Sequence, residues 1–247
     1  MKIKSLLLIL LLILSSCNSN ISKDLSSGDI TKNNITQIEY ILKDAGLSNI
    51  NIFSDWVNNY DKDNYSEGFT DADCRMTVML LAGDNISFND TEEYNGDYLM
   101  FDLDAIDNND EFSILKDKKE LFTTMFGETP ISDKGFTNTL NEKWNKYGIK
   151  VNSNRFSIIS LLFKTYETEE AFVGHTGILI DCKDNDDIQS NYIFIEKIGF
   201  GEPFKISLVN NYDELIDIFS KREDYIVDEW EPMPVVYMNE NVIGELK

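Results

Sequence analysis

The chain has 247 residues, of which 42% are apolar and 27% charged, so its composition is that of a folded protein and excludes a disordered chain. Its length allows one globular domain with a small appendage at most. A net charge of −22, without a basic patch, argues against binding to nucleic acid, because phosphates are repelled. Three cysteines and one histidine are too few for a zinc site of the Cys/His type, and we expect no metal and no cofactor.

The first seventeen residues have the pattern of an export signal. Lys2 and Lys4 precede an apolar run from Leu6 to Leu14, which is about half the roughly 20 residues that a membrane-spanning helix needs. Residues 14–17 resemble a bacterial lipobox, so we expect residues 1–16 to be removed and Cys17 to carry a lipid. That lipid predicts attachment to the outer face of the bacterial cytoplasmic membrane. A plain secretory signal with an incidental cysteine is the alternative.

Residues 17–34 are rich in Ser, Asn, Asp and Lys and predict a flexible tether. A single globular domain, 35–247, is expected to follow. In its first half, apolar residues recur at helical spacing and predict helices. These helices cover residues 35–46, 53–60, 70–83, 122–126 and 136–148. The acidic stretch 84–110 predicts a long loop or a weak strand.

The second half of the domain has the composition of β-strands. β-Branched and aromatic runs are separated by polar turns at residues 156–163, 171–182, 192–198 and 204–209. A helix is predicted at 211–222 and a last short strand at 234–238. Helices followed by an antiparallel sheet predict an α+β fold.

Cys74 is the first candidate for chemistry. Thr70 and Asp73 form a pair typical of a helix start, with Thr70 as the N-cap, which places Cys74 in the first turn. The helix dipole stabilises a thiolate there, whereas the neighbouring Asp71 and Asp73 oppose it. A histidine partner is therefore needed to activate this thiol.

His175, the only histidine, supplies that partner. It lies at the start of a predicted strand between the small residues Gly174 and Thr176, which leave room around its ring. The next strand offers Glu196 beside it. Cys74, His175 and Glu196 are thus predicted to act as nucleophile, general base and orienting carboxylate.

A disulfide is the main competing hypothesis for Cys74. Once Cys17 is lipidated, Cys74 and Cys182 remain in a compartment where disulfides form. His175 and Cys182 are 7 residues apart on one predicted strand, roughly 23 Å, whereas a disulfide needs Cα atoms within about 7 Å. The two hypotheses therefore exclude each other.

Three further polar residues lie close to the candidate site in the sequence. Glu202 and Asp181 compete with Glu196 for the role beside His175. Arg75 is expected to form a surface ion pair, with a substrate carboxylate as the alternative partner.

Asp73-Cys74 at a helix start and His175-Thr176-Gly177 at a strand start resemble the papain-like superfamily of cell-wall cysteine peptidases and amidases, the NlpC-type group. This resemblance implies a papain-like architecture and a catalytic role for Cys74 and His175. Arg75-Met76 stand where the group usually has Ser-Gly, and Glu196 stands where it commonly has His, Asn or Gln.

A second likeness extends over most of the mature chain. It is carried by Asp73-Cys74-Arg75, residues 144–149, Val173-Gly174-His175-Thr176-Gly177 and residues 194–200 with Glu202-Pro203. These segments resemble an uncharacterised bacterial lipoprotein family filed as domain of unknown function 4300. That resemblance implies no particular activity.

The sequence therefore predicts an extracytoplasmic, lipid-anchored thiol hydrolase or acyltransferase that acts on an amide or ester. A cell-wall peptide or a small molecule is the expected substrate. The alternative is a non-catalytic surface lipoprotein that binds a ligand or a partner protein, with Cys74 in a structural role.

Overall fold

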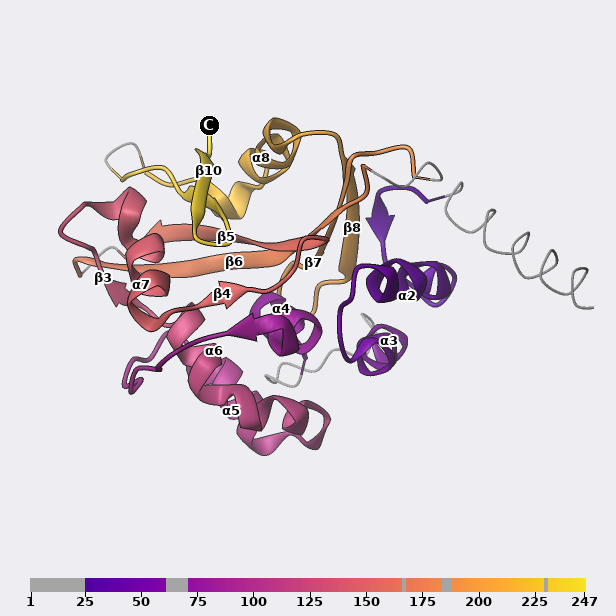
Figure 1. The fold of residues 1–247 in the computed structure, drawn as a ribbon, viewed down its shortest axis with the longest axis horizontal. Helices are drawn as coiled ribbons and strands as arrows, with labels where there is room; N and C mark the ends of the chain where they lie inside the picture. Colours follow the sequence, from indigo (N-terminus) through magenta and orange to yellow (C-terminus); the bar gives the residue numbers. More distant parts are fainter. Residues whose placement is uncertain (1–24, 61–70, 166–167, 184–187, 229–230) are drawn as a thin grey trace, which may run out of the picture.

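A computed structural model describes residues 25–60, 71–165, 168–183, 188–228 and 231–247. The described part combines helices with one large antiparallel sheet, as the α+β prediction requires (Figure 1). The predicted signal peptide, most of the tether and Thr70 lie outside the described residues. Within the described ranges, no helix is long and apolar enough to cross a membrane.

The main sheet has the strand order β1-β8-β7-β6-β5-β9-β10, and β3 pairs with β6. All the strand pairs of the described residues are antiparallel, and β2 and β4 form a separate pair. The strands are β1 (Gly28–Asp29), β2 (Ile86–Ser87), β3 (Thr129–Pro130), β4 (Lys150–Val151), β5 (Phe156–Lys164), β6 (Glu170–Asp181), β7 (Tyr192–Lys197), β8 (Phe204–Val209), β9 (Val235–Met238) and β10 (Asn241–Glu245).

Most helices cover one face of this sheet, and α8 covers the other, together with β10 (Figure 1). The helices are α2 (Ile35–Asp44), α3 (Ile50–Asn59), α4 (Cys74–Ala82), α5 (Met100–Asn108), α6 (Lys119–Phe126), α7 (Thr139–Tyr147) and α8 (Tyr212–Ser220). A long 3₁₀ helix, Asp110–Lys118, joins α5 to α6, and shorter 3₁₀ turns follow α4, precede α7 and follow α8.

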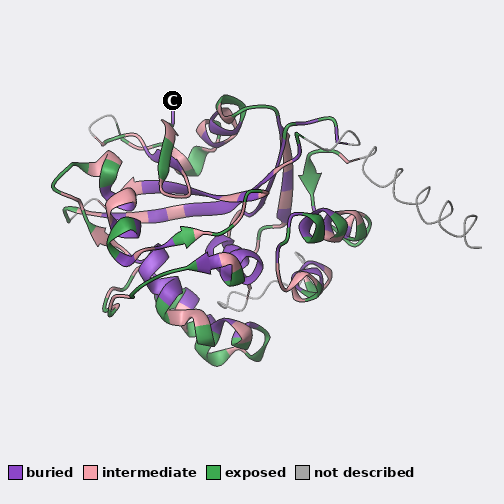
Figure 2. Ribbon diagram, viewed as in Figure 1, coloured by how far each residue is buried: buried purple, intermediate pink, exposed green. Residues whose placement is uncertain are grey.

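The sheet divides two apolar cores, because successive side chains of a strand point to opposite faces. Ile158 and Leu162 of β5 pack in the core beneath α4 and α6, whereas Ile159 and Leu161 pack with Leu215 of α8. Figure 2 shows the central strands and α4 as mostly buried, with the exposed surface on the outer helices.

The structure corrects the prediction of a loop over residues 84–110. Residues 100–108 form α5, in which Ala105 and Ile106 are buried together with Leu99 before it. Polar and apolar residues do not separate onto two faces of this helix, since Met100 and Phe101 are exposed and Asp102 is buried, so the sequence lacks a clear amphipathic pattern here. Strand β10, which pairs with β9, was also not predicted.

Candidate functional site

Cys74 is the first residue of α4. The N-cap is Asp73, whose Oδ1 accepts a hydrogen bond of 2.8 Å from the N–H of Met76. A short side chain with an acceptor oxygen is what a helix N-terminus requires at this position. The helix therefore begins three residues later than a start at Thr70 implies, but Cys74 still lies in the first turn, as its first residue.

The surroundings of the Cys74 thiol oppose its ionisation. Its residue is only 4% exposed, and burial, followed by the charge of Asp73, raises the pKa of the thiol to about 12. Arg75 and a hydrogen bond from the backbone of Thr176 act in the opposite direction but are weaker. The thiol is thus protonated at neutral pH, and it becomes a nucleophile only if a base removes its proton.

A β-bulge sets the direction of His175. In the β5–β6 ladder, Leu161 pairs with His175 and Leu162 pairs with Val173, so Gly174 is an extra residue. Without the bulge, His175 would share the face of Val173. Instead, its ring lies toward α8, with ring centroids 6.0 Å from Phe219 and 5.7 Å from Tyr225.

Gly174, next to His175, does not serve the purpose expected from the sequence, and Gly177 has a similar role in packing. A Cβ at Gly174 would lie 2.5 Å from a ring carbon of Phe163, and one at Gly177 would lie 2.4 Å from the ring of Phe194. The missing side chains therefore make room for two phenylalanines of the core and not for the imidazole.

His175 and Glu196 form a buried pair, as the sequence predicted. The Nε2 atom of His175 lies 2.6 Å from Oε2 of Glu196, and both side chains are 1% exposed. Arg222, which follows α8, donates to both carboxylate oxygens, at 2.9 and 2.5 Å. Burial alone would raise the pKa of Glu196, but His175 and Arg222 outweigh it and lower the pKa to about 2.

This arrangement determines which nitrogen of His175 carries the hydrogen in the neutral ring. Glu196 is an anion and only accepts hydrogen bonds, so Nε2 must donate to it. The other nitrogen, Nδ1, is then an acceptor, and it is buried without a hydrogen-bond partner. A buried imidazole with one nitrogen held by a carboxylate and the other free is arranged to accept a proton.

Cys74 and His175 lie on opposite faces of the sheet. Cys74, at the start of α4, packs against one face of β6, whereas the ring of His175, itself a residue of β6, lies on the α8 face. The thiol of Cys74 interacts with the backbone of Thr176, the residue after His175, but no hydrogen bond joins the thiol to Nδ1. The pairs between β6 and β7 run from Asp181 to Ile178 and stop before His175. The strands therefore lack ladder pairing at His175 and at Thr176, whose backbone the Cys74 thiol contacts.

Arg75 is not at the surface, contrary to the prediction. It is 8% exposed, and its Nη2 lies 2.7 Å from Asp73 while its Nε donates to Asp102 at 2.9 Å. It also donates to the Tyr98 hydroxyl at 3.1 Å. An arginine at the start of a buried helix needs such acids around it, but their positions in the sequence give no sign of the contact.

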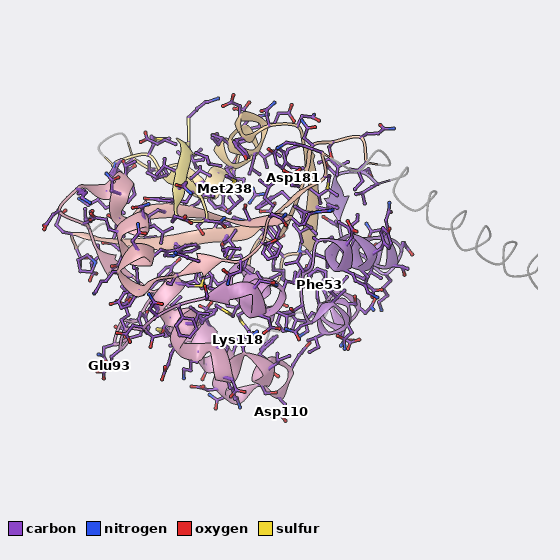
Figure 3. The ribbon with its side chains drawn as sticks, viewed as in Figure 1. Phe53, Glu93, Asp110, Lys118, Asp181 and Met238 are labelled. Atoms are coloured by element: carbon purple, nitrogen blue, oxygen red, sulfur yellow. The ribbon has the colours of Figure 1, made fainter. Side chains whose placement is uncertain are left out.

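The remaining sequence hypotheses for this region are resolved by particular contacts. Cys74 and Cys182 are both free and buried, so the disulfide is absent. Asp181, labelled in Figure 3, pairs with Lys183 at the far end of β6. Glu202 contributes its backbone oxygen to a bond with Lys197, which leaves Glu196 as the carboxylate on His175.

A pocket of about 530 Å³ lies on the α8 face beside this pair. Glu196 and Arg222 line it, together with Ile198, Glu202, Lys205, Ser207, Ile218, Glu223, Asp224 and Tyr225. Arg222 and Tyr225 were not singled out from the sequence. Arg222 is the only arginine between Glu202 and Lys247, and this is the one feature of the sequence that could have drawn attention to it.

Among the described residues, no group of three or more His, Cys, Asp or Glu side chains is arranged to hold a metal ion. Comparison with known proteins found no curated protein and no solved structure that matches this chain. One family model does match, over residues 62–243, and its description is "Domain of unknown function (DUF4300)". That range contains every residue of the candidate site, and the chain belongs to this family.

Proposed function

We propose that this chain is an extracytoplasmic, lipid-anchored protein in which Cys74, His175 and Glu196 act as a thiol hydrolase or acyltransferase on an amide or ester. One observation carries the proposal: Nε2 of His175 is held by an anionic carboxylate and Nδ1 is buried without a partner, while Cys74, the first residue of α4, contacts the backbone of the next residue on the same strand, Thr176. A nucleophile, a base and an orienting group are the parts that covalent acyl transfer requires.

The proposed reaction has two steps. Nδ1 of His175 takes the proton of the Cys74 thiol, and Sγ forms a bond to the carbonyl carbon of the substrate. The bond to the leaving amine or alcohol breaks, and that group takes the proton from His175, which leaves a thioester on Cys74. Water or an acceptor amine or alcohol then attacks the thioester with His175 as the base, and the proton returns to the sulfur.

Glu196 holds the ring in the orientation that this cycle needs and stabilises the imidazolium that forms in each step. Arg222 in turn keeps Glu196 charged, since it offsets the cost of burying the carboxylate. The pocket beside Glu196 and Arg222 is on the α8 face and is not lined by Cys74 or His175, so a substrate bound there must extend past Glu196 to reach the sulfur. A cell-wall peptide suits the proposed location, and a small-molecule substrate suits the pocket equally.

The second candidate is a non-catalytic lipoprotein that binds a ligand or a partner protein. It is favoured by the burial of Cys74 and by its thiol pKa of about 12. In that case, Cys74 fills space between α4 and β6, and the pair of His175 and Glu196 stabilises the sheet.

Trapping of the thioester separates the two candidates. We expect the full chain, incubated with an activated ester of a short acid, to gain the mass of the acyl group on the peptide that contains Cys74. Cys182 is the internal control, because it is a buried free thiol without an imidazole beside it. No acylation of Cys74, or equal labelling of Cys182, would contradict the enzymatic proposal.

A further inference from the structure

Two carboxyl groups and one guanidinium are enclosed next to Cys74. Asp73 is the N-cap of α4 and is 3% exposed, and Asp102 belongs to α5 and is 1% exposed. Arg75 donates to both oxygens of Asp102, at 2.9 and 3.1 Å, and its Nη2 lies 2.7 Å from Oδ2 of Asp73. If both acids were ionised, the cluster would hold a net negative charge away from water, which is costly.

The hydrogen bonds of this cluster indicate a proton. Oδ2 of Asp73 is buried, and no donor N–H or O–H satisfies it, although Arg75 is close. One nitrogen of Arg75, Nη2, lies 2.7 Å from Oδ2 of Asp73 and donates to Oδ2 of Asp102 at 3.1 Å, so the two carboxyl groups meet at the same atom, and a hydrogen bond between them contributes to the raised pKa of Asp102. Two carboxylates repel, so a hydrogen bond between them exists only when one of them is protonated.

We propose that Asp102 carries a proton that it shares with Asp73, and that Asp102 is thereby a positioning residue for Cys74. Asp102 acts through Asp73, which caps α4 and fixes the first turn on which Cys74 lies. This inference rests on the proposed function only in treating Cys74 as the nucleophile; the shared proton itself does not depend on it.

The charges around the two acids support this assignment. Burial, followed by the charge of Asp73, raises the pKa of Asp102 to about 8, and Arg75 lowers it by less. Of the groups that face the two acids, Arg75 and Lys197 are cations, and Lys197 already bonds Asp71 at 2.6 Å. The other titratable groups around them are Cys74, Tyr94 with its partner Glu128, and Tyr98.

The shared proton has a consequence for Cys74. The negative charges of Asp73 and Asp102 both raise the pKa of the Cys74 thiol. Below about pH 8, the proton on Asp102 removes one of these charges. Above it, the charge returns and opposes ionisation of the thiol, so the reactivity of Cys74 rises less steeply with pH than that of an isolated thiol.

Carboxyl-carbon NMR tests the proton directly in the full chain labelled with ¹³C at aspartate. We expect one aspartate signal to titrate near pH 8, to be absent in Asp102→Asn and to remain in Asp104→Asn, an exposed aspartate on the same helix. If every aspartate signal of the unsubstituted protein titrates below about pH 6, the inference is wrong. This contradicting result is measured on the unsubstituted protein, so it does not depend on the folding of a variant.

Alkylation of Cys74 tests the positioning role. The ratio of the rate in Asp102→Asn to the rate in the unsubstituted chain should be near 1 at about pH 6.5 and should rise several-fold by about pH 9.5, because only the unsubstituted chain gains a charge over that range. A ratio that is constant with pH would contradict the inference.

The same measurement in a His175→Ala background separates this inference from the proposed function. The pH-dependent ratio should persist there, since Asp102 does not act through His175. If His175→Ala leaves the alkylation of Cys74 unchanged while the ratio still varies with pH, the catalytic proposal fails and the shared proton stands.

Discussion

Glu196 connects three elements through one carboxylate. It lies on β7, holds His175 of β6 by a bond of 2.6 Å and receives two bonds from Arg222 after α8. Its neighbour Lys197 points to the other face of the sheet and bonds Asp71 at 2.6 Å. Glu196 and Lys197, adjacent at the end of β7, therefore bind on opposite faces of the sheet: Glu196 holds His175, and Lys197 holds Asp71, which precedes α4.

The low pKa of Glu196 predicts how the stability of the fold depends on pH. Because this pKa falls from 4.5 to about 2 on folding, the carboxylate stabilises the folded state above about pH 4.5, and that contribution is lost as the pH falls through 2. Glu196→Gln should therefore reduce the free energy of unfolding at pH 7 by about 1.5–3 kcal/mol and flatten its decline in acid.

Urea unfolding at several pH values measures this difference, with Glu93→Gln as the control at an exposed position. Equal stability of Glu196→Gln and the unsubstituted chain from pH 7 to pH 3 would contradict the role of this carboxylate.

At this scale, the sequence predicted one contact and missed others. His175 and Glu196 lie on neighbouring strands of a simple antiparallel order, so pairing them needed only the strand pattern. Arg222 is 26 residues from Glu196 and depends on how α8 packs on the sheet. The contact between Arg75 and Asp102 joins α4 to α5, and it was missed because the residues of α5 were predicted to be a loop.

At the scale of elements, β6 carries the geometry of the site. The bulge at Gly174 turns His175 toward α8, and the absence of a side chain at Gly177 lets the Phe194 ring pack against the strand. Strand positions were predictable from β-branched and aromatic runs, but a bulge changes which residues share a face, and the sequence pattern alone does not reveal it.

Gly177→Ala tests how tightly β6 is packed. The new Cβ would lie 2.4 Å from the Phe194 ring and 2.8 Å from the backbone oxygen of Ile195. Because the backbone cannot move aside without disturbing β7, we expect a loss of about 1–3 kcal/mol in the free energy of unfolding.

Gly199→Ala is the matched control, since a Cβ there meets nothing within 4 Å. It should change stability by less than about 0.5 kcal/mol in the same urea titration. Equal effects of the two substitutions would contradict the packing described for β6.

For the whole molecule, the proposed lipid on Cys17 makes a separate prediction. The chain should be found in the membrane fraction and should incorporate labelled fatty acid, whereas Cys17→Ser should abolish the label. Cys182→Ser is the control that keeps the anchor. Fatty-acid labelling that is unchanged in Cys17→Ser would rule out lipidation at this residue.

The order of helices before strands was sufficient to predict the α+β class of the whole molecule. The two cores were not predictable, since the division between them depends on α8 packing opposite to α4. The candidate site lies across that division, with Cys74 on one side and His175 with Glu196 on the other.

The central claim is that His175 removes the proton of Cys74, and the rate of thiol alkylation near neutral pH tests it most directly. Burial gives Cys74 a pKa of about 12 and Cys182 a pKa of about 11, so without a base Cys182 has the larger thiolate fraction. We predict that Cys74 of the full chain nevertheless reacts faster than Cys182, and that His175→Ala slows Cys74 at least about tenfold while Cys182 is unaffected. Alkylation of Cys74 that is slower than that of Cys182 and unchanged in His175→Ala would contradict the account.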